Sequence, residues 1–129
     1  MCSDPNSTGI VFLVLFVLTG CATTPHSGQP AFADIHLHYN YTHADVIDVK
    51  DTLNILKQNN VALATVSSEP TDLALKMADA SDGWIIPFAT PYYQEGNRLD
   101  WYLDKDLVNE IRSRLQTGHF GGIGEVHLT

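Results

Sequence analysis

Two histidines stand two residues apart in the stretch ADIHLHYN, residues 33–40. Successive side chains of a β-strand point to opposite faces, so Asp34, His36 and His38 are expected to share one face, with the apolar residues between them on the other. Two imidazoles side by side on a strand can each offer a nitrogen lone pair to one metal ion. The alternative is a pair of ordinary histidines on a solvent-facing strand, and only the structural context separates the two.

A second ionisable pair lies near the C-terminus, in GEVHL at residues 124–128. By the same alternation Glu125 and His127 share a face. We interpret Glu125 as a metal ligand, with a buried ion pair as the alternative. His127 is either a possible ligand, a residue that orients one, or a packing residue. Asp34 lies deeper on the first strand and is expected to hold an imidazole or a backbone amide rather than the metal.

Three other charged or titratable residues are candidates of lower specificity. Arg98 follows the third expected strand, among three aromatic residues, where it could bind a substrate carboxylate through two hydrogen bonds. A solvated arginine on a long loop is the alternative. His43 and His119 fall at a helix start and just past a helix end, so we expect both to be solvated.

The elements that position these residues alternate along the chain. Strand patterns occupy residues 33–37, 61–66, 84–90 and 122–128, although Pro87 lacks an amide donor and weakens the third. Between the strands, apolar residues recur at helical spacing. The three helical stripes contain Val46, Val49, Leu53 and Leu56, then Leu73, Ala74, Met77 and Ala78, and then Leu107, Val108, Ile111 and Leu115.

Four strands alternating with three helices predict an α/β fold built from right-handed β-α-β units around a parallel sheet. A doubly wound sheet and a (β/α)8 TIM barrel both fit this pattern. A Gly-rich loop after the first strand would favour the doubly wound sheet, but that strand ends in His, Leu, His and Tyr, which favours the barrel. A full barrel needs about 250 residues, so in this chain of 129 residues we expect residues 33–129 to be its N-terminal half.

The first residues have the pattern of a processing signal. Residues 10–18 are uninterruptedly apolar, too short for a membrane span of about 20 residues but suited to a secretory signal. The following LTGC, residues 18–21, resembles the lipobox of bacterial lipoproteins, which implies cleavage after a signal peptide of residues 1–20 and lipidation of Cys21. An unmodified thiol is the alternative. The leader departs from the lipoprotein pattern because it has no Lys or Arg and carries Asp4.

Residues 21–32 are rich in Thr, Ser, Pro and Gly and are expected to form a flexible tether between lipid and fold. The resemblance therefore implies a protein of the bacterial cell envelope, anchored to a membrane through lipid and facing the periplasm or exterior. The chain carries 15 acidic against 7 basic residues, a net charge of -8. This balance argues against nucleic acid as a partner, because the chain would repel a phosphate backbone.

The stretches DIHLHYN and GGIGEVHL together resemble the metal-dependent amidohydrolase superfamily, in particular its amidohydrolase-related (amidohydrolase-2) branch. The resemblance implies a (β/α)8 hydrolase of small molecules in which His36 and His38 bind a divalent metal, with zinc expected, and Glu125 is a ligand or bridges two metals. In that superfamily further histidines come from the fifth and sixth strands and an aspartate, the expected general base, from the eighth. Because none of these follows Thr129, we expect this chain alone to have low or no activity.

The expected reaction is attack by metal-activated water on an amide, ester or lactone. Two other functions fit the same residues. One is a phosphoesterase of the polymerase-and-histidinol-phosphatase class, which also opens with Asp-x-His-x-His, although that class usually continues with Thr or Ser where this chain has Tyr39 and Asn40. The other is a non-catalytic envelope lipoprotein that binds metal or a small ligand.

Overall fold

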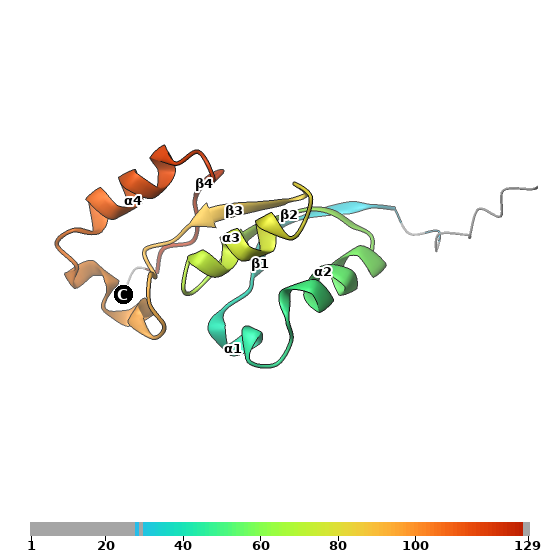
Figure 1. The fold of residues 1–129 in the computed structure, drawn as a ribbon, viewed down its shortest axis with the longest axis horizontal. Helices are drawn as coiled ribbons and strands as arrows, with labels where there is room; N and C mark the ends of the chain where they lie inside the picture. Colours follow the sequence, from blue (N-terminus) through green and yellow to red (C-terminus); the bar gives the residue numbers. More distant parts are fainter. Residues whose placement is uncertain (1–27, 29, 128–129) are drawn as a thin grey trace, which may run out of the picture.

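The computed structural model describes residue 28 and residues 30–127, and a four-stranded parallel sheet lies at its centre (Figure 1). Hydrogen bonds join the strands in the order β1-β2-β3-β4. The predicted α/β class with a parallel sheet is confirmed. The strands are β1 (Phe32–His38), β2 (Val61–Ser67), β3 (Ile85–Ala89) and β4 (Gly122–Ile123). The connections contain α1 (Tyr41–Ala44), α2 (Val49–Gln58), α3 (Asp72–Asp79), the 3-10 helices η1 (Asn97–Leu99) and η2 (Trp101–Leu103), and α4 (Leu107–Gln116).

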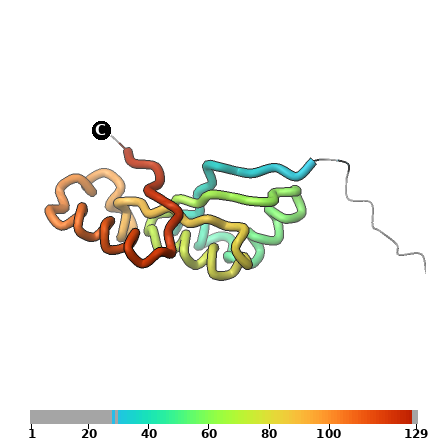
Figure 2. The backbone as a smooth tube through the Cα atoms, turned by 90° about the horizontal axis from the view of Figure 1, so that it is seen from above, coloured from blue at the N-terminus to red at the C-terminus, as the bar shows by residue number. Residues whose placement is uncertain are grey.

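The helices α2, α3 and α4 lie on one side of the sheet, as the view from above shows (Figure 2). The core fills the space between α2, α3 and the strands, where Ala64 and Val66 of β2 and Met77 of α3 are fully buried. On the other side no helix of the described chain covers the strands, and the segment after β4 turns onto this bare side (Figure 2). The side chains of Leu63 and Ile123 are exposed there. The fold thus has one packed face and one open face.

Local sequence explains where the main helices begin and end. Asp48 precedes α2, and its carboxylate accepts a hydrogen bond of 2.8 Å from the amide of Asp51, which satisfies one of the free donors of the first turn. The start of α3 is different: Thr71 precedes that helix, but its side chain makes no capping hydrogen bond. Its hydroxyl instead accepts from the amide of Thr90, 3.0 Å away, and so ties α3 to the end of β3.

Several sequence expectations need correction. β4 ends at Ile123, so the expected strand over residues 122–128 is much shorter, and residues 124–127 have no regular structure. The short helix α1 was not expected from the sequence, nor were η1 and η2. Val46 and Val108 belong to the expected helical stripes but are 86% and 64% exposed, because Val46 precedes α2 and Val108 lies on the outer side of α4.

An irregularity in β1 changes which residues share a face. Asp34 pairs with Ala64 and Leu37 pairs with Val66, so three steps along β1 match two along β2. Such a bulge breaks the simple alternation. Asp34 therefore pairs with a buried residue of the helix-covered side, and Ile35 is 77% exposed instead of packing beside Leu37.

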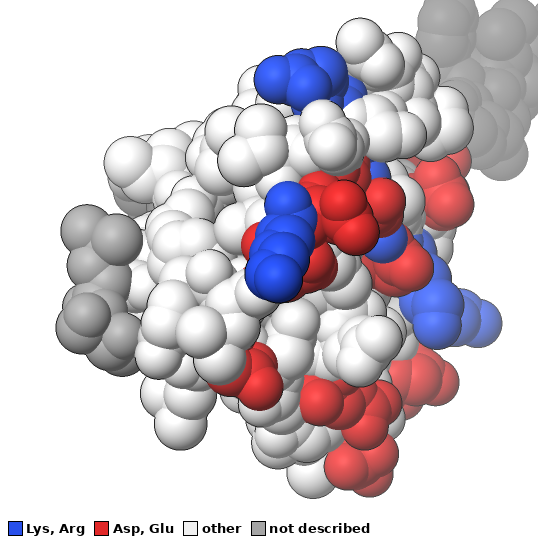
Figure 3. All heavy atoms as spheres, turned by 90° about the vertical axis from the view of Figure 1, so that its left-hand side faces the viewer, with Lys and Arg blue, Asp and Glu red and all other residues white. Residues whose placement is uncertain are grey.

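Within the described residues, no helix has the length and apolar character needed to span a membrane. The expected leader (residues 1–20) and Cys21 lie outside those residues, as does most of the expected tether (residues 21–32), whose last residue, Phe32, begins β1. On the face drawn in Figure 3, basic side chains are separated from one another by uncharged and acidic ones.

Candidate metal centre

The carboxyl ends of β1 and β4, the two outer strands of the sheet, carry three side chains with possible metal ligands. His36 and His38 lie at the end of β1, and Glu125 lies two residues beyond β4. One ligand atom from each lies within 4.8 Å of the others. The structure therefore brings together the residues that the sequence analysis assigned as ligands.

The spacing of these atoms matches the requirements of a small divalent cation. Nε2 of His36 lies 3.0 Å from Nε2 of His38, and Oε2 of Glu125 lies 3.4 Å from the first and 3.0 Å from the second. Nitrogen and oxygen ligands about 2.0 to 2.1 Å from a tetrahedral Zn²⁺ are separated from each other by about 3.3 to 3.4 Å. Two histidines and a glutamate are also a known ligand set of catalytic zinc, one that leaves a position open for water or substrate.

A backbone contact sets the tautomer of His38. Its Nδ1 lies 2.9 Å from the carbonyl oxygen of Ser67, at the end of β2. A carbonyl oxygen only accepts, so Nδ1 carries the proton and donates it. Nε2 of the neutral ring then has a free lone pair, and this nitrogen is the one that faces His36 and Glu125. A ligating histidine is commonly oriented by such a hydrogen bond from its other nitrogen.

This tautomer leaves a lone pair of His38 opposite a carboxylate oxygen. Nε2 of His38 and Oε2 of Glu125 are 3.0 Å apart, and two acceptor atoms at that distance repel each other unless a proton or cation lies between them. The arrangement therefore suits a cation shared by both side chains.

The position of Glu125 follows from the residue before it, Gly124, whose backbone packs closely against Ser67 of β2. A Cβ on Gly124 would lie 2.1 Å from Oγ of Ser67 and 3.3 Å from Cβ of Phe88, so only glycine fits without displacing its neighbours. The amide of Gly124 donates to the carbonyl of Ala89 at 2.7 Å, which extends the pairing with β3 beyond the end of β4.

His127 is held by three side chains from the loop after β3. The hydroxyl of Tyr92 accepts from the His127 amide at 2.8 Å and lies 2.9 Å from its Nδ1, while Arg98 hydrogen-bonds to Nε2. Trp101 donates from its indole nitrogen to the His127 carbonyl at 3.1 Å. Nε2 of His127 lies 3.6 Å from Oε1 of Glu125, so this histidine contacts the possible ligand but is not one of the three converging residues.

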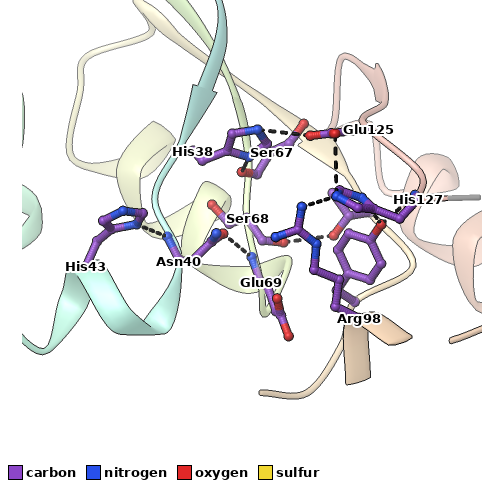
Figure 4. Close-up of a pocket in the computed structure, with 11 residues that line it drawn as sticks. His38, Asn40, His43, Ser67, Ser68, Glu69, Arg98, Glu125 and His127 are labelled. Atoms are coloured by element: carbon purple, nitrogen blue, oxygen red, sulfur yellow. Dashed lines mark hydrogen bonds and ion pairs between the residues drawn. The ribbon is translucent and has the colours of Figure 1, made fainter. Parts of the chain in front are cut away.

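Beside the three converging residues lies a cavity of about 180 Å³ (Figure 4). It opens at the ends of all four strands, where functional groups of parallel α/β folds usually gather. Burial raises the pKa of the Tyr92 hydroxyl at this cavity, although the hydrogen bond from the His127 amide and the charge of Arg98 lower it in part, so the hydroxyl stays protonated at neutral pH. The lining residues are His38, Asn40, His43, Ser67, Ser68, Glu69, Thr90, Tyr92, Arg98, Glu125 and His127.

The remaining sequence candidates are placed as follows. Asp34 accepts a hydrogen bond of 3.0 Å from the His36 amide, so its carboxylate holds backbone rather than joining the three converging residues. His43 is exposed as expected, yet it also lines the cavity, and its Nδ1 accepts from the Asn40 amide at 3.0 Å. His119 is exposed and does not line the cavity.

Sequence reasoning missed Asn40, Ser68, Glu69, Thr90 and the part that Tyr92 plays. All of them follow the carboxyl end of a strand within a few residues, and that position was the signal that could have found them. Their small or common polar side chains form no recognisable motif, so position alone would have had to identify them.

Comparison of the chain with protein-family models, with curated proteins and with solved structures found no match.

Proposed function

We propose that this chain is the N-terminal half of a metal-dependent hydrolase of amidohydrolase type, which acts on an amide, ester or lactone of a small molecule. The observation that carries the proposal is the convergence of His36, His38 and Glu125 within 4.8 Å at the carboxyl ends of parallel strands. The resemblance of the same two sequence stretches to that superfamily supports it independently of the geometry.

The topology favours a barrel over a doubly wound sheet. The strands follow one another in spatial order, β1-β2-β3-β4, whereas a doubly wound sheet reverses direction at a switch point and carries helices on both faces. Here α2, α3 and α4 share one side (Figure 2). Sequential parallel strands with helices only outside are the arrangement of a (β/α)8 barrel.

Under this proposal the three residues hold one divalent ion, for which zinc is the best match to the donor set. The bound ion would supply a hydrolytic nucleophile at neutral pH and would polarise the substrate carbonyl. His38 offers Nε2 because Ser67 fixes its tautomer. Glu125, which follows β4, would bring a negative charge to the ion from the side opposite β1. Nε2 of His127 lies 3.6 Å from the other carboxylate oxygen of Glu125. The cavity beside them receives the substrate.

The resemblance assigns the general base to an aspartate of an eighth strand, and the described residues contain only four strands. We therefore propose low or no turnover for this chain alone. We also retain the proposal that Cys21 is lipidated and that the protein is anchored in the bacterial cell envelope.

The proposal is tested by zinc titration of the purified chain in a calorimeter. One Zn²⁺ per chain is expected. His38→Gln and Glu125→Gln should each weaken binding at least a hundredfold, because losing even an outer partner of a ligand costs 10- to 100-fold. His119→Gln is the matched control and should bind normally. Stoichiometric binding that survives both site variants, or no binding at all, would refute the proposal.

Hydrolysis is then assayed with Zn²⁺ or Mn²⁺ against a panel of carboxylic esters, lactones, amides and phosphate esters. Any slow turnover should be confined to the carboxylic substrates and should disappear in His38→Gln and after chelation. Turnover of phosphate esters alone would favour the phosphoesterase. Clear turnover of carboxylic esters would contradict the expected low activity of the chain by itself.

A further inference from the structure

The cavity wall away from His38 and Glu125 contains several hydrogen-bond donors that have no acceptor among the described residues. Ser68 is the most constrained of them. Its residue is only 2% exposed, it lines the cavity, and its hydroxyl has no hydrogen-bond partner among the described residues. A buried hydroxyl without a partner costs about 1 to 3 kcal/mol. Such a group is explained when a ligand supplies the missing acceptor.

The hydroxyl of Tyr92 is a second donor, as the hydrogen bonds around it indicate. Arg98 can only donate, so Nε2 of His127 must accept from it, and the neutral ring then carries its proton on Nδ1. Nδ1 therefore donates to the Tyr92 hydroxyl oxygen at 2.9 Å, and the His127 amide donates to the same oxygen at 2.8 Å. With its oxygen accepting twice, the hydroxyl of Tyr92 retains its own proton for a further acceptor at the cavity that it lines.

Arg98 adds a positive charge. Figure 4 shows its side chain reaching into the cavity, with the guanidinium beside His127. One of its five N–H groups is used by His127, and the others are available in a planar fork that suits an oxyanion. Glu69, which follows β2 and also lines the cavity, points away from Arg98 in this view, and its Oε1 accepts from the Gly96 amide at 2.9 Å.

We propose that Arg98, Tyr92 and Ser68 form a subsite for a carboxylate group of the substrate, beside the metal centre. This inference rests on the proposed function, since it names the chemical class of substrate for the same site: acyl compounds, such as N-acyl amino acids, with a carboxylate near the bond that is hydrolysed. Arg98 hydrogen-bonds to Nε2 of His127, and that nitrogen lies 3.6 Å from Oε1 of Glu125, so the subsite borders the metal centre.

The cavity is large enough for one functional group of a ligand but too small for a whole ligand. Its volume of about 180 Å³ is below the roughly 300 to 1,000 Å³ of complete small-molecule pockets. A second hollow of about 260 Å³ on the bare side of the sheet is lined by His36, His38 and Glu125 together with apolar residues such as Ile35 and Phe88. His38 and Glu125 line both hollows, and His36 lines the second one only.

The test is NMR or calorimetric titration of the full chain with N-acetylglycine and with N-acetylglycinamide. These probes have nearly the same shape, but only the first carries a carboxylate. Titrations are run without metal and with Zn²⁺, because a carboxylate could also bind to the ion. We expect N-acetylglycine to bind at least tenfold more tightly than the amide in both states, since charge-assisted hydrogen bonds are the stronger kind.

Three variants locate the subsite. Arg98→Gln should weaken binding of N-acetylglycine about tenfold or more, and Tyr92→Phe and Ser68→Ala should each weaken it about two- to tenfold. The matched control is Arg112→Gln, because Arg112 is exposed on α4 and hydrogen-bonds Asn109. Circular dichroism of each variant verifies the fold, and binding of N-acetylglycinamide should stay unchanged in all four.

The outcomes separate this inference from the proposed function. Zinc binding without preference for the carboxylate would overturn the subsite and leave the metal centre intact. Carboxylate binding that depends on Arg98 in a chain that binds no zinc would support the subsite and refute the hydrolase. Inorganic phosphate is the third probe, and tighter Arg98-dependent binding of phosphate than of N-acetylglycine would overturn the assignment to carboxylates.

Discussion

Nε2 of His38 lies 3.0 Å from Oε2 of Glu125, although one residue ends the first strand and the other follows the fourth. The carbonyl of Ser67 sets the side of the His38 ring that faces the carboxylate. This contact across the sheet is the central feature of the site, and it leads to several measurable consequences.

The tautomer of His38 can be observed directly. In the metal-free chain at a pH where its ring is neutral, ¹⁵N NMR should find the proton on Nδ1, because the Ser67 carbonyl accepts it at 2.9 Å. Addition of Zn²⁺ should shift the Nε2 resonance and leave the proton on Nδ1. The exposed His119 is the internal control and should not respond to zinc. A proton found on Nε2 of His38 would contradict the assigned orientation.

Substitution of Gly124 should damage both stability and metal binding. The added Cβ of Gly124→Ala would overlap Oγ of Ser67 and approach Cβ of Ser67 and of Phe88 closely, and we expect the segment that carries Glu125 to move away from β2 and β3. Overpacking of this kind costs about 1 to 3 kcal/mol. Urea unfolding and zinc titration measure the two effects.

Gly122→Ala is the matched control for that substitution. It lies two residues earlier, in β4, and its added Cβ would make ordinary contacts of 3.7 Å or more with Phe88. Equal losses of stability and zinc affinity in the two variants would show that the close approach of Gly124 does not position Glu125.

Tyr93 should make stability fall at high pH. Burial and the nearby acids Glu110 and Asp104 raise its pKa to about 12, whereas in the unfolded chain it titrates near 10. Between these values the folded state binds more protons than the unfolded state, so the free energy of unfolding decreases as pH rises from about 10 to about 12. Below pH 10 this contribution is fully present.

Urea unfolding at pH 9 and pH 11 measures this effect. Tyr93→Phe should show a smaller loss of stability between the two pH values than the unsubstituted chain. It should also be somewhat less stable at pH 9, since it lacks the hydrogen bond from the hydroxyl to the Leu107 carbonyl at 3.3 Å. Identical pH dependence of the two proteins would exclude Tyr93 as the cause.

Lipidation of Cys21 is tested by expression of the full sequence in a bacterium. The chain should be found in the membrane fraction with a mass that reflects loss of residues 1–20 and addition of lipid. Cys21→Ser should abolish both changes, because the sulfur is the expected attachment point. Cys2→Ser should change neither, since Cys2 leaves with the leader. Membrane association that persists without Cys21 would refute the lipid anchor.

The sequence by itself determined the order of the four strands and the three longer helices, and the residues near the strand ends. Apolar periodicity is a local property, and it predicted β2, α3 and β3 within two residues of their ends and identified Leu53, Leu73 and Met77 as inner residues. The His-x-His spacing and the Glu125 that follows the fourth strand pattern were likewise visible as candidate ligands in the sequence.

Tertiary structure decided what depends on the register between strands. The bulge that pairs Asp34 with Ala64, the end of β4 at Ile123 and the orientation of His38 by Ser67 all arise from hydrogen bonds between segments far apart in sequence. The cavity exists only because segments at the ends of all four strands meet, and it is there that the Ser68 hydroxyl has no partner among the described residues. Local sequence patterns carry no information about contacts between distant segments, because the same side-chain alternation is compatible with several strand registers.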